Sequence, residues 1–304
     1  MSLDPAYLEY PRRRHGYDHD LYPWSALHDR PPIRWPGGAA VAVWICIGLE
    51  YFPIQPSDTP FRAPGHMATP YPDFRHYTAR DYGTRIGVHR LLDAVRDVGA
   101  TISVAANSAI ADHAPGLLGS IAAAGHEIIA HSTDMNGTIA TGLDRDAEHL
   151  LIESALDRIE RDTGTRPSGW LSIARSQSEN TLDLLRAAGI RYCADWVNDE
   201  LPFRFTNGLL NLPLNHELSD RQVISVQQNS ADSYAQQLLD AFDWLAGEAA
   251  AGGGGRMLPI HLTPYISGLP YRIGAIERLL GELKARGAWF ASGAQILDAW
   301  EAQA

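Results

Sequence analysis

The sequence predicts an α/β fold in which mainly parallel strands form an imperfect barrel with helices outside it. Two observations carry this prediction. Eight short apolar, β-branched runs of strand length recur along the chain, and segments with apolar residues at intervals of three and four lie between most of them. Strands that alternate with helices form mainly parallel sheets, because each helix returns the chain to the same edge of the sheet.

The expected elements follow one another from residue 39 to residue 292. We expect strands at residues 39–49, 101–106, 126–131, 169–173, 190–195, 208–214, 257–262 and 288–292. We expect helices at residues 85–99, 114–125, 147–164, 179–189, 233–252 and 275–287, several of which end in glycine, as helix C-termini prefer. Residues 1–38, rich in Pro, Arg, Tyr and His, are expected to form an irregular arm, and residues 39–304 a single barrel domain.

Composition limits the partners of the chain. It has 304 residues and a formal net charge of −11, without a run rich in Lys and Arg. Nucleic acids and anionic membranes need a basic surface, so we expect neither as a partner. No apolar run reaches the roughly 18 uncharged residues of a spanning helix, and the N-terminal residues lack the apolar stretch of a signal peptide. We therefore expect a cytoplasmic protein with a small-molecule substrate, and the aromatic N-terminal segment makes a homo-oligomer an option.

Polar residues at the ends of the first and third predicted strands are the first site candidates. Barrels of this type place their chemistry at the C-terminal ends of the strands. Glu50 follows the first strand, and His131 follows the third, with Asp134 and Asn136 close behind it. A carboxylate there is a candidate base or metal ligand, and a histidine is a candidate acid or base.

Further candidates follow the fourth and fifth strands. Arg175 lies in a polar loop, where an arginine can hold a carboxylate or stabilise an oxyanion. Asp195 and Asp199 come after the fifth strand, with Trp196 between them. An aspartate between an apolar strand and a large aromatic can be a desolvated carboxylate with a raised pKa, or it can cap the next turn.

The later strands add His216 and Glu217 after the sixth, and His261, Thr263 and Arg272 around the end of the seventh. The sequence contains no GxSxG motif, and its only two cysteines precede strand ends within apolar runs. This combination favours attack by an activated water over a covalent intermediate.

The connection after the first strand is long, aromatic and rich in proline. It spans residues 51–77, a length that is unusual unless the segment covers a site or packs on a partner. We interpret it as a lid from which His66, Asp73 and His76 could reach the barrel mouth.

Four segments together resemble the polysaccharide deacetylase (NodB-homology) family, in particular the branch that contains metal-independent allantoinase and a bacterial peptidoglycan deacetylase. They are YTARDYGTRIGVHRLLDAVRDVGATISVAANSAI, AAAGHEIIAHSTDMN, RPSGWLSIARSQSENTLDLLRAAGIRYCADWVNDELPF and TPYISGLPYRIGAIERLL. The likeness runs from about residue 35 to about residue 300. It implies a distorted (β/α) barrel of seven or eight strands and hydrolysis of a carbon–nitrogen bond that is not a peptide bond.

The resemblance also implies a zinc site, which this sequence matches only in part. The deacetylases hold zinc through a carboxylate after the first strand and an H-x-x-x-H pair after the third. Glu50 matches the carboxylate and His131 the first histidine, but Met135 stands in the place of the second. A thioether is a poor ligand for zinc beside oxygen and imidazole donors.

Two more family positions differ. The acidic base of the deacetylases lies within two positions of the metal carboxylate, where this chain has Gly48 or Tyr51. The late catalytic histidine corresponds to Thr263, two residues beyond His261. Sugar N-deacetylation by the zinc mechanism is therefore not expected.

Three hypotheses remain open. The first is a hydrolase of a small amide, cyclic imide or ureide that needs no cofactor. Its expected catalytic residues are Glu50, His131, Asp195 and His261, and its expected substrate-binding residues are Arg175, Trp196, Asp199 and Thr263. The second is a remodelled N-deacetylase in which Glu50, His131 and Asp134 bind a divalent cation such as zinc. The third is a catalytically silent member that binds a small molecule or a glycan.

Overall fold

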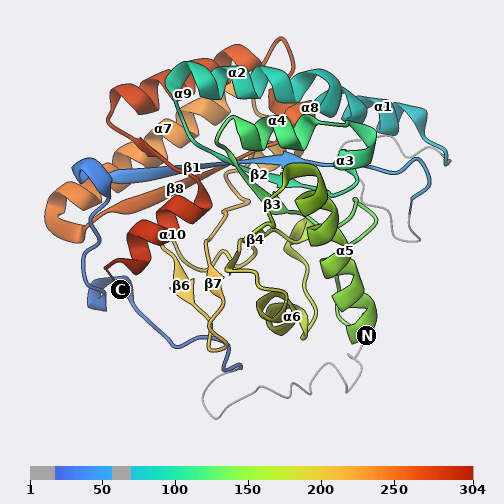
Figure 1. Cartoon of the computed structure of the whole chain (residues 1–304). Coiled ribbons are helices and arrows are strands. Elements are labelled where there is room, and N and C mark those ends of the chain that lie inside the picture. The colour runs from blue at the N-terminus through green and yellow to red at the C-terminus, as the bar shows by residue number, and fades with distance from the viewer. Residues whose placement is uncertain (1–17, 57–69, 304) are drawn as a thin grey trace, which may run out of the picture.

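The computed structural model describes residues 18–56 and 70–303, and its framework is one curled sheet of mostly parallel strands (Figure 1). The strand order is β6-β7-β5-β4-β3-β2-β1-β8, and β9 pairs with β1. The pairing is parallel except between β6 and β7. The strands are β1 (Val41–Leu49), β2 (Ser103–Ala106), β3 (Glu127–Ala130), β4 (Gly169–Trp170), β5 (Tyr192–Cys193), β6 (Phe203–Arg204), β7 (Leu210–Asn211), β8 (Arg256–Leu262) and β9 (Trp289–Phe290).

The predicted fold class is confirmed. All eight predicted strands are present, although β4, β5, β7 and β9 keep only two residues each of the runs that predicted them. The strand β6 was not predicted, because two residues are too few for an alternating pattern. The described strands do not close into a ring: β8 and β6 end the series, so the sheet is the incomplete barrel that the sequence indicated.

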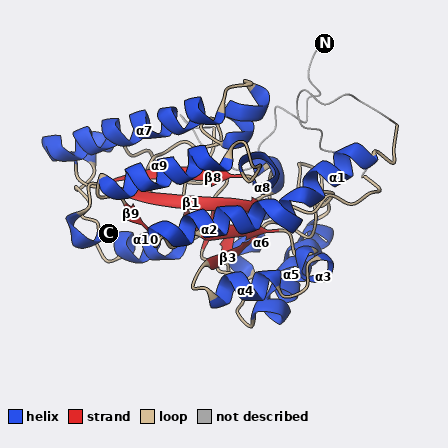
Figure 2. Cartoon of the chain, turned by 90° about the horizontal axis from the view of Figure 1, so that it is seen from above, coloured by secondary structure: helices blue, strands red, loops and turns tan. Residues whose placement is uncertain are grey.

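Helices cover the outer face of the sheet (Figure 2). Figure 1 shows α2, α7 and α9 on one side of β1, and α10 on the other. The α-helices are α1 (Phe74–Tyr82), α2 (Val88–Val98), α3 (Ile110–His113), α4 (Leu117–Ala123), α5 (Arg145–Thr163), α6 (Thr181–Ala187), α7 (Ala231–Glu248), α8 (Pro264–Ser267), α9 (Ile273–Ala285) and α10 (Gly293–Glu301). Shorter turns of 3₁₀ or π type are η2 (Leu27–Asp29), η3 (Pro36–Gly38), η4 (Gly83–Gly87), η5 (Ile173–Arg175), η6 (Arg221–Val226) and η7 (Ala249–Gly253).

The alternation along β1 separates two hydrophobic cores. Every residue of β1 is buried, as expected for a parallel strand with both faces covered. Its odd-numbered side chains, from Val41 to Leu49, pack against the outer helices. The even-numbered Ala42, Trp44 and Cys46 pack inside the barrel, where α10 adds apolar side chains. The next even positions are therefore the ones that face the mouth of the barrel.

The predicted lid is partly helical. Residues 57–69, which include His66, lie outside the described residues. The helix α1 begins at Phe74, and the side chain of Asp73 caps it by accepting a hydrogen bond from the backbone nitrogen of His76 at 3.0 Å. The position of Asp73 is therefore explained by helix capping.

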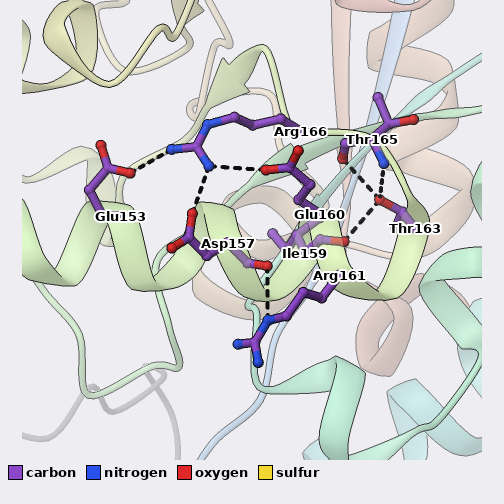
Figure 3. A network of polar contacts seen from close by, with 8 residues as sticks. All are labelled: Glu153, Asp157, Ile159, Glu160, Arg161, Thr163, Thr165 and Arg166. Carbon is purple, nitrogen blue, oxygen red and sulfur yellow. Dashed lines mark hydrogen bonds and ion pairs between the residues drawn. The ribbon is translucent and has the colours of Figure 1, made fainter.

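The longest helix, α5, is joined at its C-terminal end to the following turn. Arg166 reaches back to Glu153, Asp157 and Glu160, at N···O distances of 2.5, 2.7 and 3.1 Å (Figure 3). These three carboxylates lie four and three residues apart, on one face of the helix. Exposed pairs of this kind contribute little each to stability.

None of the described helices is both long and apolar enough to span a membrane.

Backbone contact between η4 and α8 predicts a position where only glycine is tolerated. A Cβ atom on Gly87 would overlap the carbonyl oxygen of Pro264. We expect Gly87→Ala to lower the free energy of unfolding by about 1–3 kcal/mol, the usual cost of overpacking, in urea denaturation. Gly281→Ala is the control, because its Cβ would meet no atom within 4 Å in the described structure. That change should raise stability by about 0.5–1 kcal/mol, and equal effects at both glycines would contradict the packing argument.

Candidate active site

The interior face of β1 supplies the first group of the site. Gly48 and Glu50 continue the alternation that points Trp44 and Cys46 into the barrel. Glu50 is 7% exposed. A carboxylate at this depth is costly unless it is paired, so its partners define the local chemistry.

Glu50 is paired with Arg221, the first residue of η6. Nη2 of Arg221 lies 2.5 Å from Oε1 of Glu50. The same nitrogen donates to the hydroxyl of Tyr265 at 2.9 Å. That hydroxyl in turn donates to Oε2 of Glu50 at 2.8 Å. Burial alone raises the pKa of Glu50, but the attraction and hydrogen bond of Arg221 outweigh it and lower the pKa below the usual 4.5. Glu50 is therefore an ionised carboxylate at neutral pH.

His131 is the first residue after β3 and is held in one tautomer. Its Nδ1 lies 2.6 Å from the carbonyl oxygen of Leu171. Because a carbonyl only accepts, Nδ1 carries the proton and the lone pair is on Nε2. Burial lowers the pKa of His131 below its usual 6.5, although the negative charge of Glu50 opposes this effect. His131 is thus a neutral base at neutral pH.

Asn107 follows β2 and holds the ends of the neighbouring strands together. Its Nδ2 donates to the carbonyl oxygen of His131, and its Oδ1 accepts from the backbone nitrogen of Tyr51 at 2.7 Å. Ser132 has a φ of 62°, in the left-handed region that non-glycine residues rarely adopt outside functional sites. The backbone beside Glu50 and His131 is therefore set by one buried amide.

His261 brings a second imidazole to the same space. It lies opposite Cys46 in the parallel register of β1 and β8. Its side chain is buried, and its Nε2 has no hydrogen-bond partner among the described residues. A Cβ atom on Gly48 would lie 3.1 Å from this nitrogen and 3.7 Å from Oε1 of Glu50. The missing side chain of Gly48 therefore leaves the imidazole and the carboxylate facing a common gap.

Arg175 provides positive charge at the mouth. Its φ is 55°, and its Nε and Nη2 donate to the carbonyl oxygen of Leu214 at 3.1 and 2.9 Å. Burial lowers its pKa to about 10, so it remains cationic at neutral pH. Burial and the charge of Arg175 together hold the pKa of His261 well below 6.5. His261 is therefore also neutral.

Asp195 is the desolvated carboxylate that the sequence indicated, but its oxygens are already engaged. They accept from the backbone nitrogen and hydroxyl of Ser172 at 2.7 and 2.8 Å and from Nε2 of Gln177 at 2.5 Å. Burial raises its pKa against these hydrogen bonds. Gln177 also accepts from Nε1 of Trp196 at 3.0 Å. The expected role of Asp195 as a water-activating base is thus less well supported than a role in positioning the loop that carries Arg175.

Trp196 and Asp199 lie on different cavities. Trp196 lines an open cavity of about 440 Å³ with Arg175 and Asp195. Asp199 instead forms an ion pair with Arg30 at 2.7 Å and lines a larger cavity of about 970 Å³ beside the N-terminal segment. The larger cavity has neither the imidazoles nor Glu50 in its lining. The structure therefore does not bring Asp199 to the other candidates.

Thr263 is fully buried at the end of β8. Its backbone nitrogen donates to Oδ2 of Asp220 at 2.6 Å, and the hydroxyl of Ser267 donates to the same oxygen at 2.6 Å. Burial raises the pKa of Asp220 to about 6. The Oγ1 of Thr263 has no well-aligned hydrogen bond within the described parts of the chain, but it lies close enough to Asp220 to lower the pKa of that carboxyl.

The alternative cation site of Glu50, His131 and Asp134 does not fit this arrangement. Within residues 18–56 and 70–303, no three His, Cys, Asp or Glu side chains are placed to hold a metal ion. The guanidinium of Arg221 stands directly against Glu50, where it would repel a bound cation.

The residues after His131 are also committed to other contacts. Asp134 accepts from the backbone nitrogen of Asn136 at 2.8 Å, which makes it a turn residue. Met135, in the place of the second family histidine, packs with Phe52 and Ile173 in a small apolar cluster. The three side chains of the alternative cation site are therefore not arranged as a common ligand set in the described structure.

Four residues of the candidate site were not predicted from the sequence. Asn107 and Tyr265 each lie within three residues of a strand end, so the strand-end rule could have found them. Asp220 and Arg221 lie nine and ten residues after β7, and no pattern in that link points to the barrel mouth. They reach the site only through the folding of that link.

The incomplete (β/α) barrel is similar to solved structures of an allantoinase and of polysaccharide deacetylases. No family model matches the chain. The Puue allantoinase has a similar solved structure, with 26% sequence identity, a TM-score of 0.82 and coverage of 93% of this chain and 98% of that chain. A second, described as "probable Polysaccharide deacetylase from Pseudomonas aeruginosa PAO1", has 25% identity, a TM-score of 0.82 and coverage of 93% and 99%.

A relative is also found by sequence. A Schizosaccharomyces pombe protein named "Putative polysaccharide deacetylase" is 22% identical over 299 residues, which cover 88% of this chain and 92% of the relative. The predicted resemblance to polysaccharide deacetylases and allantoinase is therefore confirmed.

The Glu50–Arg221 pair predicts a specific pattern of stability. Removing either partner leaves the other charge buried and alone, so we expect Glu50→Gln and Arg221→Met each to cost about 3–5 kcal/mol in free energy of unfolding. The double variant should cost clearly less than the sum of the two single changes in urea denaturation. Additive losses would show that the two groups do not interact.

Proposed function

We propose that the chain hydrolyses a non-peptide carbon–nitrogen bond in a small amide, cyclic imide or ureide by means of an activated water. The observation that carries this proposal is the pair of neutral imidazoles, His131 and His261, beside the ionised Glu50 at the mouth of the barrel. The names of the similar proteins, an allantoinase and polysaccharide deacetylases, support the same bond type.

The lone pair on Nε2 of His131 makes this residue the proposed general base. Water gives one proton to Nε2 while its oxygen attacks the carbonyl carbon. Nδ1 keeps its hydrogen bond to Leu171 throughout, so the ring stays oriented. The imidazolium that forms is stabilised by the nearby charge of Glu50, which raises the pKa of His131. When the carbon–nitrogen bond breaks, the same proton passes to the leaving nitrogen.

Positive groups stabilise the negative oxygen of the tetrahedral intermediate. Arg175 remains cationic and lines the open cavity with Trp196, which offers an aromatic face to a planar substrate. Nε2 of His261 has no hydrogen-bond partner in the described structure, and Oγ1 of Thr263 has only the nearby carboxyl of Asp220. These atoms are the proposed contacts for the substrate amide.

A second candidate function is binding without turnover. The engagement of Glu50 by both Arg221 and Tyr265 favours it, because this carboxylate is not free to act as a base. In that case a small amide or glycan would bind at the mouth and leave unchanged.

Replacement of His131 separates the two functions. His131→Asn keeps an amide nitrogen that can donate to Leu171 but removes the Nε2 lone pair. We expect kcat for hydantoin or allantoin to fall by about 10²–10⁴-fold with KM little changed, measured as release of the ring-opened acid. His149→Gln, at an exposed histidine of α5, should keep wild-type kinetics. Turnover that survives in His131→Asn would refute the base assignment, and a wild-type protein that binds but never hydrolyses would favour the silent function.

The pH dependence follows from the lowered pKa of His131. The base must be neutral, so kcat/KM should stay flat above pH 6.5 and fall only as the pH drops through a pKa below the usual 6.5. The charge of Glu50 raises this pKa, so Glu50→Gln should move the acid limb to still lower pH. A limb that stays in place would show that Glu50 does not act on the base.

A further inference from the structure

A cavity of about 200 Å³ adjoins the Glu50–Arg221 pair and is lined by three arginines, Arg80, Arg221 and Arg272. Tyr265 and Ser225 add hydroxyl groups to the wall. No carboxylate lines this cavity in the described structure. Three guanidiniums around one small space repel one another, so an anion in that space would lower the energy of all of them.

Arg80 is the strongest indication that the cavity can accept an anion. Arg80 is only 2% exposed. Its guanidinium lies over the rings of Phe52 and Tyr265, 4.5 and 5.5 Å from their centres. Its Nη1 donates to the carbonyl oxygen of His76 at 2.9 Å. Its Nε and Nη2 have no well-aligned hydrogen-bond acceptor among the residues described, although the Tyr265 hydroxyl and the charge of Glu50 act on the guanidinium. A buried cation whose donors lack aligned acceptors is costly, and a carboxylate is the usual group that satisfies two such donors at once.

The other two arginines differ in how far they are already paired. Arg221 is neutralised by Glu50. The guanidinium of Arg272, the residue just before α9, donates to the carbonyl oxygen of Ile266 at 3.2 Å and lies 5.0 Å from the ring centre of Tyr271, and neither contact carries a negative charge. The cavity therefore has more positive charge than its own side chains compensate.

The position of the cavity connects it with the proposed chemistry. The same Nη2 atom of Arg221 touches Glu50 and Tyr265, and Arg221 and Tyr265 both line the cavity. Only the guanidinium of Arg221 thus separates a group in the cavity from the carboxylate of Glu50. A volume of about 200 Å³ exceeds the roughly 30 Å³ of one water several-fold, so it has room for a carboxylate and a short chain.

We propose that this arginine cavity binds the carboxylate of the substrate, so that the hydrolysed amide, imide or ureide carries a short acidic arm. This inference rests on the proposed hydrolase function. A free small anion offers the same chemistry, and the test distinguishes the two sources.

The test compares hydantoin with hydantoin-5-acetate, which differ by one carboxymethyl arm, by isothermal titration calorimetry. We expect the acid to bind the wild-type protein at least about tenfold more tightly, as hydrogen bonds to charged groups provide. Arg272→Gln should remove this preference and leave hydantoin binding unchanged, while Arg272→Lys should retain part of it. Arg278→Gln is the matched control, since Arg278 lies on the same helix and forms an exposed ion pair with Asp232.

Equal binding of the two probes, or a preference that survives in Arg272→Gln, would overturn the proposal. Sodium acetate should compete with hydantoin-5-acetate in the wild-type protein. If acetate binds in an Arg272-dependent manner without displacing the acid, the cavity takes a free anion and the substrate assignment is wrong. Turnover is scored separately. Arg272-dependent binding without hydrolysis of any amide, cyclic imide or ureide supports the cavity and refutes the hydrolase function, whereas hydrolysis of hydantoin without preference for the acid supports the hydrolase function and refutes the cavity.

Discussion

The ion pair between Glu50 and Arg221 is the interaction on which the rest of the site depends. Glu50 directly follows β1 and is too buried to stay charged alone. The guanidinium of Arg221 keeps the pKa of this carboxylate low. The charge that results acts on His131, while Arg221 and Tyr265 form one wall of the arginine cavity. One pair therefore joins the proposed base to the proposed carboxylate pocket.

Both imidazoles are positioned by backbone features and not by a charged partner. The carbonyl of Leu171 orients the ring of His131, and the side chain of Asn107 holds the backbone carbonyl of His131. The register of β1 and β8 places His261, and the absence of a side chain on Gly48 leaves room before it. Because both rings are buried among cations, both stay neutral. A site of this kind can accept a proton from water at neutral pH without a metal ligand set.

Much of the site could be predicted because it follows strand periodicity. Glu50, His131 and His261 lie directly at or after strands whose apolar pattern is clear, and side chains alternate faces along a strand. The structure places Asp199 away from the other candidates. The strand β5 has only two residues and does not determine the path of the loop six residues later, and the carboxylate of Asp199 pairs with Arg30 of the N-terminal segment. Asp195 was recognised as desolvated, but its hydrogen bonds to Ser172 and Gln177 come from a neighbouring loop that no local pattern describes.

By itself the sequence determined the parallel α/β framework, the strands that carry the candidates, and the loss of the second family histidine at Met135. These features are local, since they depend on periodicity and on single residues at known offsets. Only the tertiary structure brought Arg221 to Glu50 across 171 positions of the chain, and placed Arg80 and Arg272 around one cavity. Charges attract or repel through space, so which of them meet depends on how the chain folds and not on their order along it.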